Sequence, residues 1–222
     1  MAKTNHQWDD EVDVIVVGLG AAGACAALQA AQDGAEVAVV DRFEGGGATA
    51  ISGGIFYAGG GTHIQEEAGV EDSVDAMFEY LKLEVRDAVE EKTLRDFCEQ
   101  SIDNLTWLEA QGVEFEASLC PYKTSYPLDQ YCLYYSGNES LQPYAQAAKP
   151  AQRGHRVKGK GMPGKRFFEP LKRAAHKLGM RFFYQSQAER LIADESGRVV
   201  GLEIRQLLPG ALTTWLHRVL ER

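Results

Sequence analysis

Residues 12–41, VDVIVVGLGAAGACAALQAAQDGAEVAVVD, carry the pattern that decides the fold. The apolar run over residues 14–17 predicts a buried strand, and the Ala- and Leu-rich run that follows predicts a closely packed helix. Gly34 can end that helix, and residues 36–40 predict a second strand that leads into Asp41. This order of strand, helix and strand predicts an α/β fold with a parallel sheet.

Three glycines at the junction of the first strand and helix, Gly18, Gly20 and Gly23, form the pattern G-x-G-x-x-G. Gly18 permits a tight turn, Gly20 lets the backbone approach a pyrophosphate, and Gly23 lets helix and strand pack closely. The helix N-terminus offers N–H groups and the positive end of its dipole to phosphates. Asp41 follows Gly20 by 21 residues, which suits a carboxylate that binds ribose hydroxyls. The stretch predicts a dinucleotide site; the alternative is an ordinary strand–helix–strand unit whose glycines serve packing alone.

The composition is that of an ordinary globular protein. Of 222 residues, 45% are hydrophobic and 25% are charged, and this length suffices for one sizeable core or two small ones. The net charge of −9 argues against nucleic acid as a general partner. No apolar run is long enough to span a bilayer, and residues 1–11 are polar and acidic, unlike a signal peptide, so we expect a cytoplasmic protein. The four cysteines form no C-x-x-C pair, and we expect no metal site.

A second glycine-rich run, GGGATAISGGIFYAGGGT, covers residues 45–62. Small residues let the backbone lie close to a flat or charged group, and Ser52 adds a hydroxyl. We interpret the run as a second cofactor contact, to the remaining phosphate, ribitol and ring of a flavin. The alternative is a flexible surface loop, but Ile51, Ile55 and Phe56 are too apolar for a solvated linker.

The middle of the chain predicts two helices and a tyrosine-rich segment. Apolar residues recur at helical spacing over residues 71–86 and 93–111, with Thr93 as a candidate cap and Gly112 as a candidate end. Tyrosines and prolines then gather over residues 115–145, which predicts a hairpin or a long ordered loop. Tyrosine side chains suit a flat hydrophobic ligand, and they suit a domain interface equally well.

A basic run extends from Arg153 to Arg173. Within it, residues 159–165 fit G-x-x-x-x-G-K, but Arg166 replaces the Ser or Thr of a P-loop, so we reject nucleotide hydrolysis. The simplest interpretation is a solvated helix face, with His155 as a hydrogen-bonded structural residue. Arg153 and His155 alternate along a predicted strand, however, and could instead face a flavin or its substrate.

The last part of the chain predicts a helix over residues 167–178 that Gly179 ends. Strands follow over residues 181–186, 188–192 and 199–204, the last two as a hairpin around a tight turn at 195–197. Residues 207–222 predict part of a further helix.

A family resemblance is carried by four segments: VIVVGLGAAG at 14–23, VVDRFEGGGATAISGG at 39–54, RGHRVKGKG at 153–161 and AERLIADESGRVVGLEI at 188–204. Together they resemble the FAD-binding part of the fumarate reductase and succinate dehydrogenase flavoprotein superfamily. That resemblance implies a Rossmann-like, three-layer fold with a parallel sheet and an added β-hairpin or meander. SGGIFYAGGGT at 52–62 and YKTSYPLDQYCLYYSGNES at 122–140 are most similar to 3-ketosteroid dehydrogenases that act on the Δ4 bond of 5α-reduced 3-ketosteroids.

The resemblance implies FAD as the cofactor and assigns parts of the site to it. The first glycine motif would meet the pyrophosphate, Asp41 with Arg42 the adenosine ribose, and Ala188 the adenine. The second glycine run would approach the pyrophosphate and the isoalloxazine. The residues so implied are Gly18, Gly20, Ala21, Ala22, Gly23, Asp41, Arg42, Ala48, Thr49, Ser52, Gly53, Gly54 and Ala188.

The resemblance also implies the reaction, a dehydrogenation of adjacent carbons beside a carbonyl, with a small steroid-like ketone as substrate. Family members are roughly twice as long, so we expect an N-terminal portion whose capping substrate domain is absent, and we assign no catalytic residue. Its FAD-binding core would comprise residues 10–66 and 152–206, with an insertion over 67–151. Two alternatives stay open: a soluble fumarate reductase, whose dicarboxylate needs cationic clamps such as Arg153 and Arg156, and a non-catalytic dinucleotide-binding fragment. The electron acceptor and the oligomeric state are not predicted.

Overall fold

The computed structural model describes residues 7–207, 210, 216, 217 and 219. It divides into two compact units, one formed by residues 1–48 and 171–222 and the other by residues 49–170. The predicted helix over residues 207–222 lies largely outside the described residues. In the part of the chain that is described, no helix is both long and apolar enough to cross a membrane.

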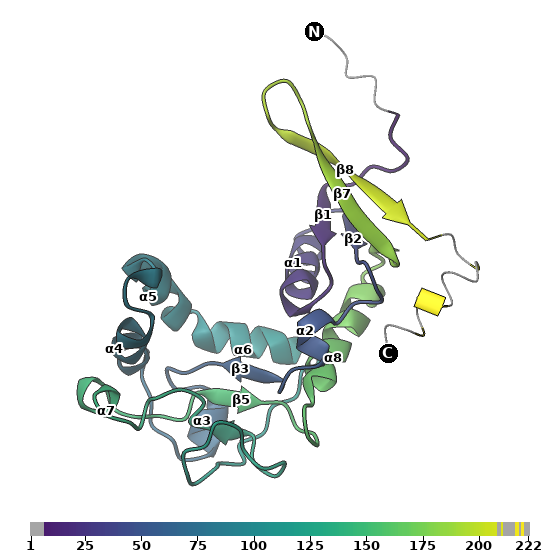
Figure 1. Cartoon of the computed structure of the whole chain (residues 1–222). Coiled ribbons are helices and arrows are strands. Elements are labelled where there is room, and N and C mark those ends of the chain that lie inside the picture. The colour runs from purple at the N-terminus through teal and green to yellow at the C-terminus, as the bar shows by residue number, and fades with distance from the viewer. Residues whose placement is uncertain (1–6, 208–209, 211–215, 218, 220–222) are drawn as a thin grey trace. The chain divides into compact units, whose positions relative to one another are not determined.

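The first unit is built on a parallel sheet (Figure 1). Its strands, in spatial order, are β1 (Val14–Val17), β2 (Val37–Val40) and β6 (Arg181–Phe183). Helix α1 (Ala21–Gln32) connects β1 to β2 and packs on both. The predicted strand–helix–strand unit and its parallel sheet are therefore confirmed.

The burial of β1 differs from the prediction. Every residue of β2, which has a partner on each side, is buried, whereas Ile15 and Val17 of β1 are 42% and 55% exposed. Among the described residues β1 pairs along one edge, with β2. An apolar run of this kind is typical of a strand covered on both faces. In β1 the face that carries Ile15 and Val17 is instead exposed.

A β-hairpin completes the first unit. It pairs β7 (Ser186–Ala193) with β8 (Val199–Gln206), around a turn in which the Asp194 carboxylate accepts hydrogen bonds from the amides of Ser196 and Arg198. The hairpin is confirmed, and it is longer than the sequence pattern predicted. A cavity of about 750 Å³ is lined by residues of this hairpin, of the sheet and of the segment 7–12.

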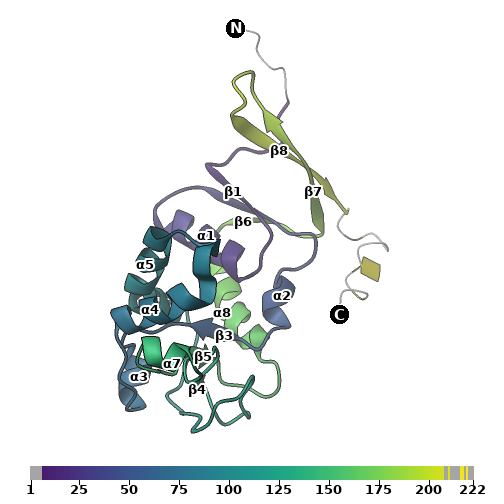
Figure 2. The same cartoon turned by 60° about the vertical axis from the view of Figure 1, so that its left-hand side comes forward.

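The second unit holds a small antiparallel sheet. Strand β5 (Gly154–Arg156) lies between β3 (Ile55–Tyr57) and β4 (Leu133–Tyr134). Around it the chain forms helices α3 (His63–Glu67), α4 (Val74–Val85), α5 (Glu91–Glu99), α6 (Ser101–Ala110) and α7 (Tyr144–Ala147) and the 3-10 turn Arg86–Ala88. Figure 2 shows α4 and α5 side by side, where they share a core of Met77, Phe78, Leu94 and Cys98. Two further helices, α2 (Gly47–Ala50) and α8 (Gly164–Lys177), cross the boundaries at which the chain passes from one unit to the other.

Two predictions in this unit need correction. The single helix predicted over residues 93–111 is two helices, because Gln100, with φ −85° and ψ 0°, ends α5 and begins α6. The cap of α5 is Glu90, so the assignment of Thr93 as a cap was wrong. Gly112 follows α6 with φ +93°, as a residue that ends a helix does. The tyrosine-rich segment is mainly ordered loop, interrupted by β4 and α7.

Candidate functional site

The first glycine motif forms a close contact between β1 and α1. Gly18 has φ +92° and donates its amide to Val40 O at 2.8 Å. A Cβ on Gly23 would lie 1.8 Å from Gly18 O, so no larger residue fits there without moving the backbone. Helix α1 begins after Gly20, which has no side chain that could cap it. A helix N-terminus that follows a glycine turn has the geometry that binds phosphates.

Asp41 organises the same turn. Its Oδ2 accepts a hydrogen bond from Leu19 N at 2.6 Å, and its Oδ1 accepts bonds from Phe43 N at 2.7 Å and Gly45 N at 3.3 Å. The carboxylate thus fixes the loops that follow β1 and β2, a role that the sequence did not reveal. Each carboxylate oxygen can accept more than one hydrogen bond, so a ribose hydroxyl can still bind there.

A small aromatic stack lies beside Asp41. The Arg42 guanidinium lies 4.8 Å from the centre of the Phe43 ring, and the His217 ring stacks on Phe43 at 5.2 Å. His217 Nδ1 also contacts Gln185 Oε1. Sequence reasoning singled out neither Phe43 nor His217, because nothing local shows that positions so far apart in the chain meet.

The second glycine run is ordered and not a flexible loop, since it forms α2, a turn over residues 51–54 and β3. Ser52 Oγ donates to Thr49 O at 2.8 Å and accepts from Gly54 N at 3.1 Å. The main chain is held too, since Gly164 N donates to Ser52 O and Val157 N donates to Gly54 O, both at 2.9 Å. A Cβ on Gly164 would lie 2.0 Å from Thr49 O, so the start of α8 and this turn are in direct backbone contact.

The predicted cofactor residues fall on both units. Ala48 and the residues of the first motif belong to the first unit, as does Ala188, which pairs with Ile204 in the hairpin. Thr49 begins the second unit, which also holds Ser52, Gly53 and Gly54. Within each unit the structure brings together residues that the sequence pattern grouped.

Two arginines of the basic run, Arg153 and Arg156, are not part of a solvated face, whereas Arg166 and Arg173 are exposed on α8, as predicted. Arg153 and Arg156 are both fully buried, so the predicted solvated helix face is wrong for them. Arg153 forms an ion pair with buried Asp72, with Nη2 2.6 Å from Oδ1 and Nε 2.9 Å from Oδ2. Burial alone would raise the pKa of Asp72, but the hydrogen bonds and charge of Arg153 lower that pKa below its ordinary value.

A second buried carboxyl lies near this pair. Glu139 accepts a hydrogen bond from Tyr57 OH at 3.2 Å and one from Gly137 N at 3.0 Å. Its burial raises the pKa of the carboxyl, and the same effect raises the pKa of the Tyr57 hydroxyl.

His155 is a structural residue, as the simplest interpretation held. Its Nδ1 lies 3.0 Å from Arg153 O and its Nε2 lies 2.9 Å from Thr62 Oγ1, and the side chain is fully buried. A carbonyl oxygen can only accept, so Nδ1 carries the proton and Nε2 accepts from the Thr62 hydroxyl. That hydroxyl in turn caps α3 by accepting from Gln65 N. Burial lowers the pKa of His155 to about 4, which keeps it neutral.

The four cysteines are free thiols. Cys98, Cys120 and Cys132 are buried and Cys25 is half-buried. Burial raises the pKa of Cys25, and it raises that of Cys98 to about 11, so both stay protonated at neutral pH.

Comparison with known proteins accounts for the two glycine segments. The family model described as FAD binding domain matches residues 13–219. The chain belongs to this family. FAD is thus indicated as the cofactor, and the start of α1 behind the glycine turn fits its pyrophosphate. The predicted superfamily, its Rossmann-like fold and its cofactor are confirmed.

Individual relatives point to one branch of the family. The chain is 44% identical over 219 residues to a 3-oxo-5-alpha-steroid 4-dehydrogenase of Comamonas testosteroni, covering 97% of this chain and 41% of that protein. It is similar in structure to the 3-ketosteroid-delta4-(5alpha)-dehydrogenase of Rhodococcus jostii RHA1 in complex with 4-androstene-3,17-dione, with TM-score 0.87 and 38% identity over 92% of this chain and 44% of that one. A flavocytochrome c3 fumarate reductase is more distant, with TM-score 0.71 and 29% identity over 88% of this chain and 30% of that one. The chain spans less than half the length of these relatives, as expected for a portion of such a protein.

Proposed function

We propose that this chain is the FAD-binding part of a dehydrogenase that oxidises a CH–CH bond of a 3-ketosteroid. The observation that carries the proposal is the likeness to two steroid dehydrogenases over nearly the whole chain. FAD supplies an acceptor for a hydride, so removal of hydrogen from two adjacent carbons balances as one hydride and one proton. We assign the proton acceptor to no residue of this chain.

The roles that we propose for the chain's residues follow from their placement. In the first unit, the turn at Gly18, Gly20 and Gly23, with Ala21 and Ala22 at the start of α1, would bind the pyrophosphate. Asp41 and Arg42 would bind the adenosine ribose, and Ala188 in β7 would contact the adenine through backbone groups. Ala48, Thr49, Ser52, Gly53 and Gly54 would face the pyrophosphate and the isoalloxazine; this assignment rests on the family resemblance and on the ordered turn.

The buried arginines argue against a dicarboxylate substrate. A fumarate-type reaction needs cations that can bind two carboxylates. Arg153 is held by Asp72, and Arg156 is held by a set of carbonyl oxygens and Asp129, and neither side chain is exposed. An apolar ketone places no such demand on these residues, so we favour the steroid. We keep the predictions of a cytoplasmic location and of no nucleic-acid partner, the latter on the net charge of −9.

The test uses the whole natural protein that carries this chain, with and without Gly23→Ala. We expect flavin absorption near ~450 nm that persists through desalting. We also expect turnover of a 3-ketosteroid with an artificial electron acceptor, and no reduction of fumarate with an artificial electron donor. Gly23→Ala should abolish retention of the flavin, because its Cβ would meet Gly18 O at 1.8 Å. The matched control is Ala26→Ser on the exposed side of α1, which should retain the flavin. A protein that binds no FAD, or that turns over fumarate and no steroid, would refute the proposal.

A further inference from the structure

Two loops of the second unit, over residues 126–131 and 159–161, meet at Arg156, the last residue of β5. Its guanidinium donates from Nε to Tyr126 OH at 2.9 Å and from Nη2 to Gly159 O at 2.8 Å and Gly161 O at 3.1 Å. Nη2 also lies 3.2 Å from Asp129 Oδ1. The side chain is fully buried, and most of its partners are backbone carbonyls. Removing a charge from water is costly, so a buried guanidinium matched to several loop carbonyls points to a need for fixed geometry.

Tyr126 extends this arrangement to the second glycine turn. Its hydroxyl accepts from Arg156 and has one proton to donate; Gly161 O lies at 2.7 Å and Gly53 O at 3.2 Å. The Tyr126 ring also packs against Gly53, where an added Cβ would lie 2.5 Å from Tyr126 Cε2. Tyr126 thus contacts the Gly53 peptide through its hydroxyl and its ring, while the amide of the same peptide, Gly54 N, donates to Ser52 Oγ.

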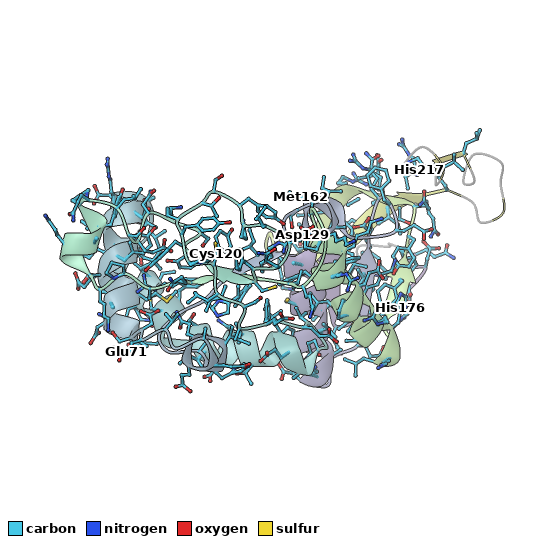
Figure 3. The ribbon with its side chains drawn as sticks, turned by 90° about the horizontal axis from the view of Figure 1, so that it is seen from below. Glu71, Cys120, Asp129, Met162, His176 and His217 are labelled. Atoms are coloured by element: carbon cyan, nitrogen blue, oxygen red, sulfur yellow. The ribbon has the colours of Figure 1, made fainter. Side chains whose placement is uncertain are left out.

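Asp129 is the third side chain of this arrangement, after Arg156 and Tyr126. Its Oδ1 accepts from Gly161 N at 2.8 Å and from Arg156, while half of its side chain is exposed. Figure 3 shows Asp129 beside Met162, which follows Gly161. We call Arg156, Tyr126 and Asp129 the Arg156 cluster. It joins segments that lie about 30 residues or more apart in the chain: Gly53, residues 126–131 and residues 159–161.

We propose that the Arg156 cluster is a positioning device that holds the Gly53 backbone for the flavin. The inference rests on the proposed function, which places Gly53 and Gly54 against the cofactor. The rest of the turn is anchored locally, by Val157 N to Gly54 O, by Gly164 N to Ser52 O and by the Ser52 hydroxyl. The Gly53 carbonyl is the part of the turn that the cluster controls through a side chain. A binding contact of this kind must be held to within about 0.5 Å. The Arg156 guanidinium ties residues 126–131 to residues 159–161, and Tyr126 extends these bonds to Gly53.

The experiment compares Tyr126→Phe with Tyr122→Phe in the whole natural protein. Tyr126→Phe removes the hydroxyl that links Arg156 to Gly53 and Gly161, whereas Tyr122 is 44% exposed, lies in the same segment and packs edge-on against Tyr131. We expect Tyr126→Phe to raise the dissociation constant for FAD roughly tenfold and to change the visible circular dichroism of the bound flavin. Tyr122→Phe should change neither. Asp129→Asn is a milder change at a half-exposed site. It should raise the dissociation constant for FAD and change the circular dichroism of the flavin in the same direction as Tyr126→Phe, but by less.

The outcomes separate the two proposals. A wild-type protein that binds FAD, together with a Tyr126→Phe variant whose affinity and flavin spectrum match those of Tyr122→Phe, overturns this inference alone. A lower midpoint of thermal unfolding in Tyr126→Phe with an unchanged flavin spectrum also overturns it, because the cluster would then serve folding only. A wild-type protein that takes up no FAD refutes the proposed function, and this inference with it.

Discussion

Mild acid should destabilise the protein through His155. In the folded chain the His155 pKa is lowered to about 4 by burial, against 6.5 for an unperturbed histidine. Between these two values the unfolded chain binds a proton that the folded chain excludes, so the free energy of unfolding rises with pH and falls on acidification. From pH 7 to pH 5 this linkage amounts to about 2 kcal/mol of lost stability.

Denaturant unfolding at pH 7, 6 and 5 measures the effect in the wild type and in His155→Gln. Tryptophan fluorescence can follow the transition, since Trp107 lies in α6 of the same unit. The variant should be less stable at pH 7 by about 1–3 kcal/mol, because Arg153 O and the Thr62 hydroxyl lose their partner. Its stability should also fall about 2 kcal/mol less between pH 7 and pH 5 than that of the wild type.

His63→Gln is the matched control, because the His63 side chain is 51% exposed and pairs with Glu109 at the surface. At pH 7 it should cost less than about 0.5 kcal/mol, because the site is at the surface. If His155→Gln and the wild type lose the same free energy between pH 7 and pH 5, His155 is not a buried neutral group and the reasoning fails.

Two further substitutions test the packing of the second unit by denaturant unfolding at neutral pH. Asp72→Asn leaves the buried Arg153 charge without its carboxylate and should lower the free energy of unfolding by about 3–5 kcal/mol. Its control, Asp75→Asn at an exposed ion pair, should lower it by less than about 1 kcal/mol. Equal losses in the two variants would contradict the burial argument. Gly164→Ala should cost at least about 1–3 kcal/mol, since its Cβ would meet Thr49 O at 2.0 Å. Lys165→Ala, on the exposed side of α8, should stay within about 0.5 kcal/mol of the wild type, and a similar loss for both would disprove the contact.

The sequence alone determined the local units of the fold and the type of cofactor. Residues 14–40 predict β1, α1 and β2 because the apolar periods and the glycines act over neighbouring positions. The hairpin of β7 and β8 was predictable for the same reason, since its strands flank one tight turn. The extent of the cofactor core and the individual cofactor contacts remain predictions.

The tertiary structure decided what the charged side chains do. Arg153 and Arg156 lie in a basic run that is typical of a solvated surface, yet their partners come from positions 72 and 126–131, which no local pattern connects to them. Asp41 was predictable as an acid after β2, but its bonds to Leu19 and Gly45 depend on two loops meeting. The sequence shows which donors and acceptors each side chain carries. Which of them form hydrogen bonds across distant parts of the chain depends on the tertiary structure, because such bonds exist only once the chain has folded.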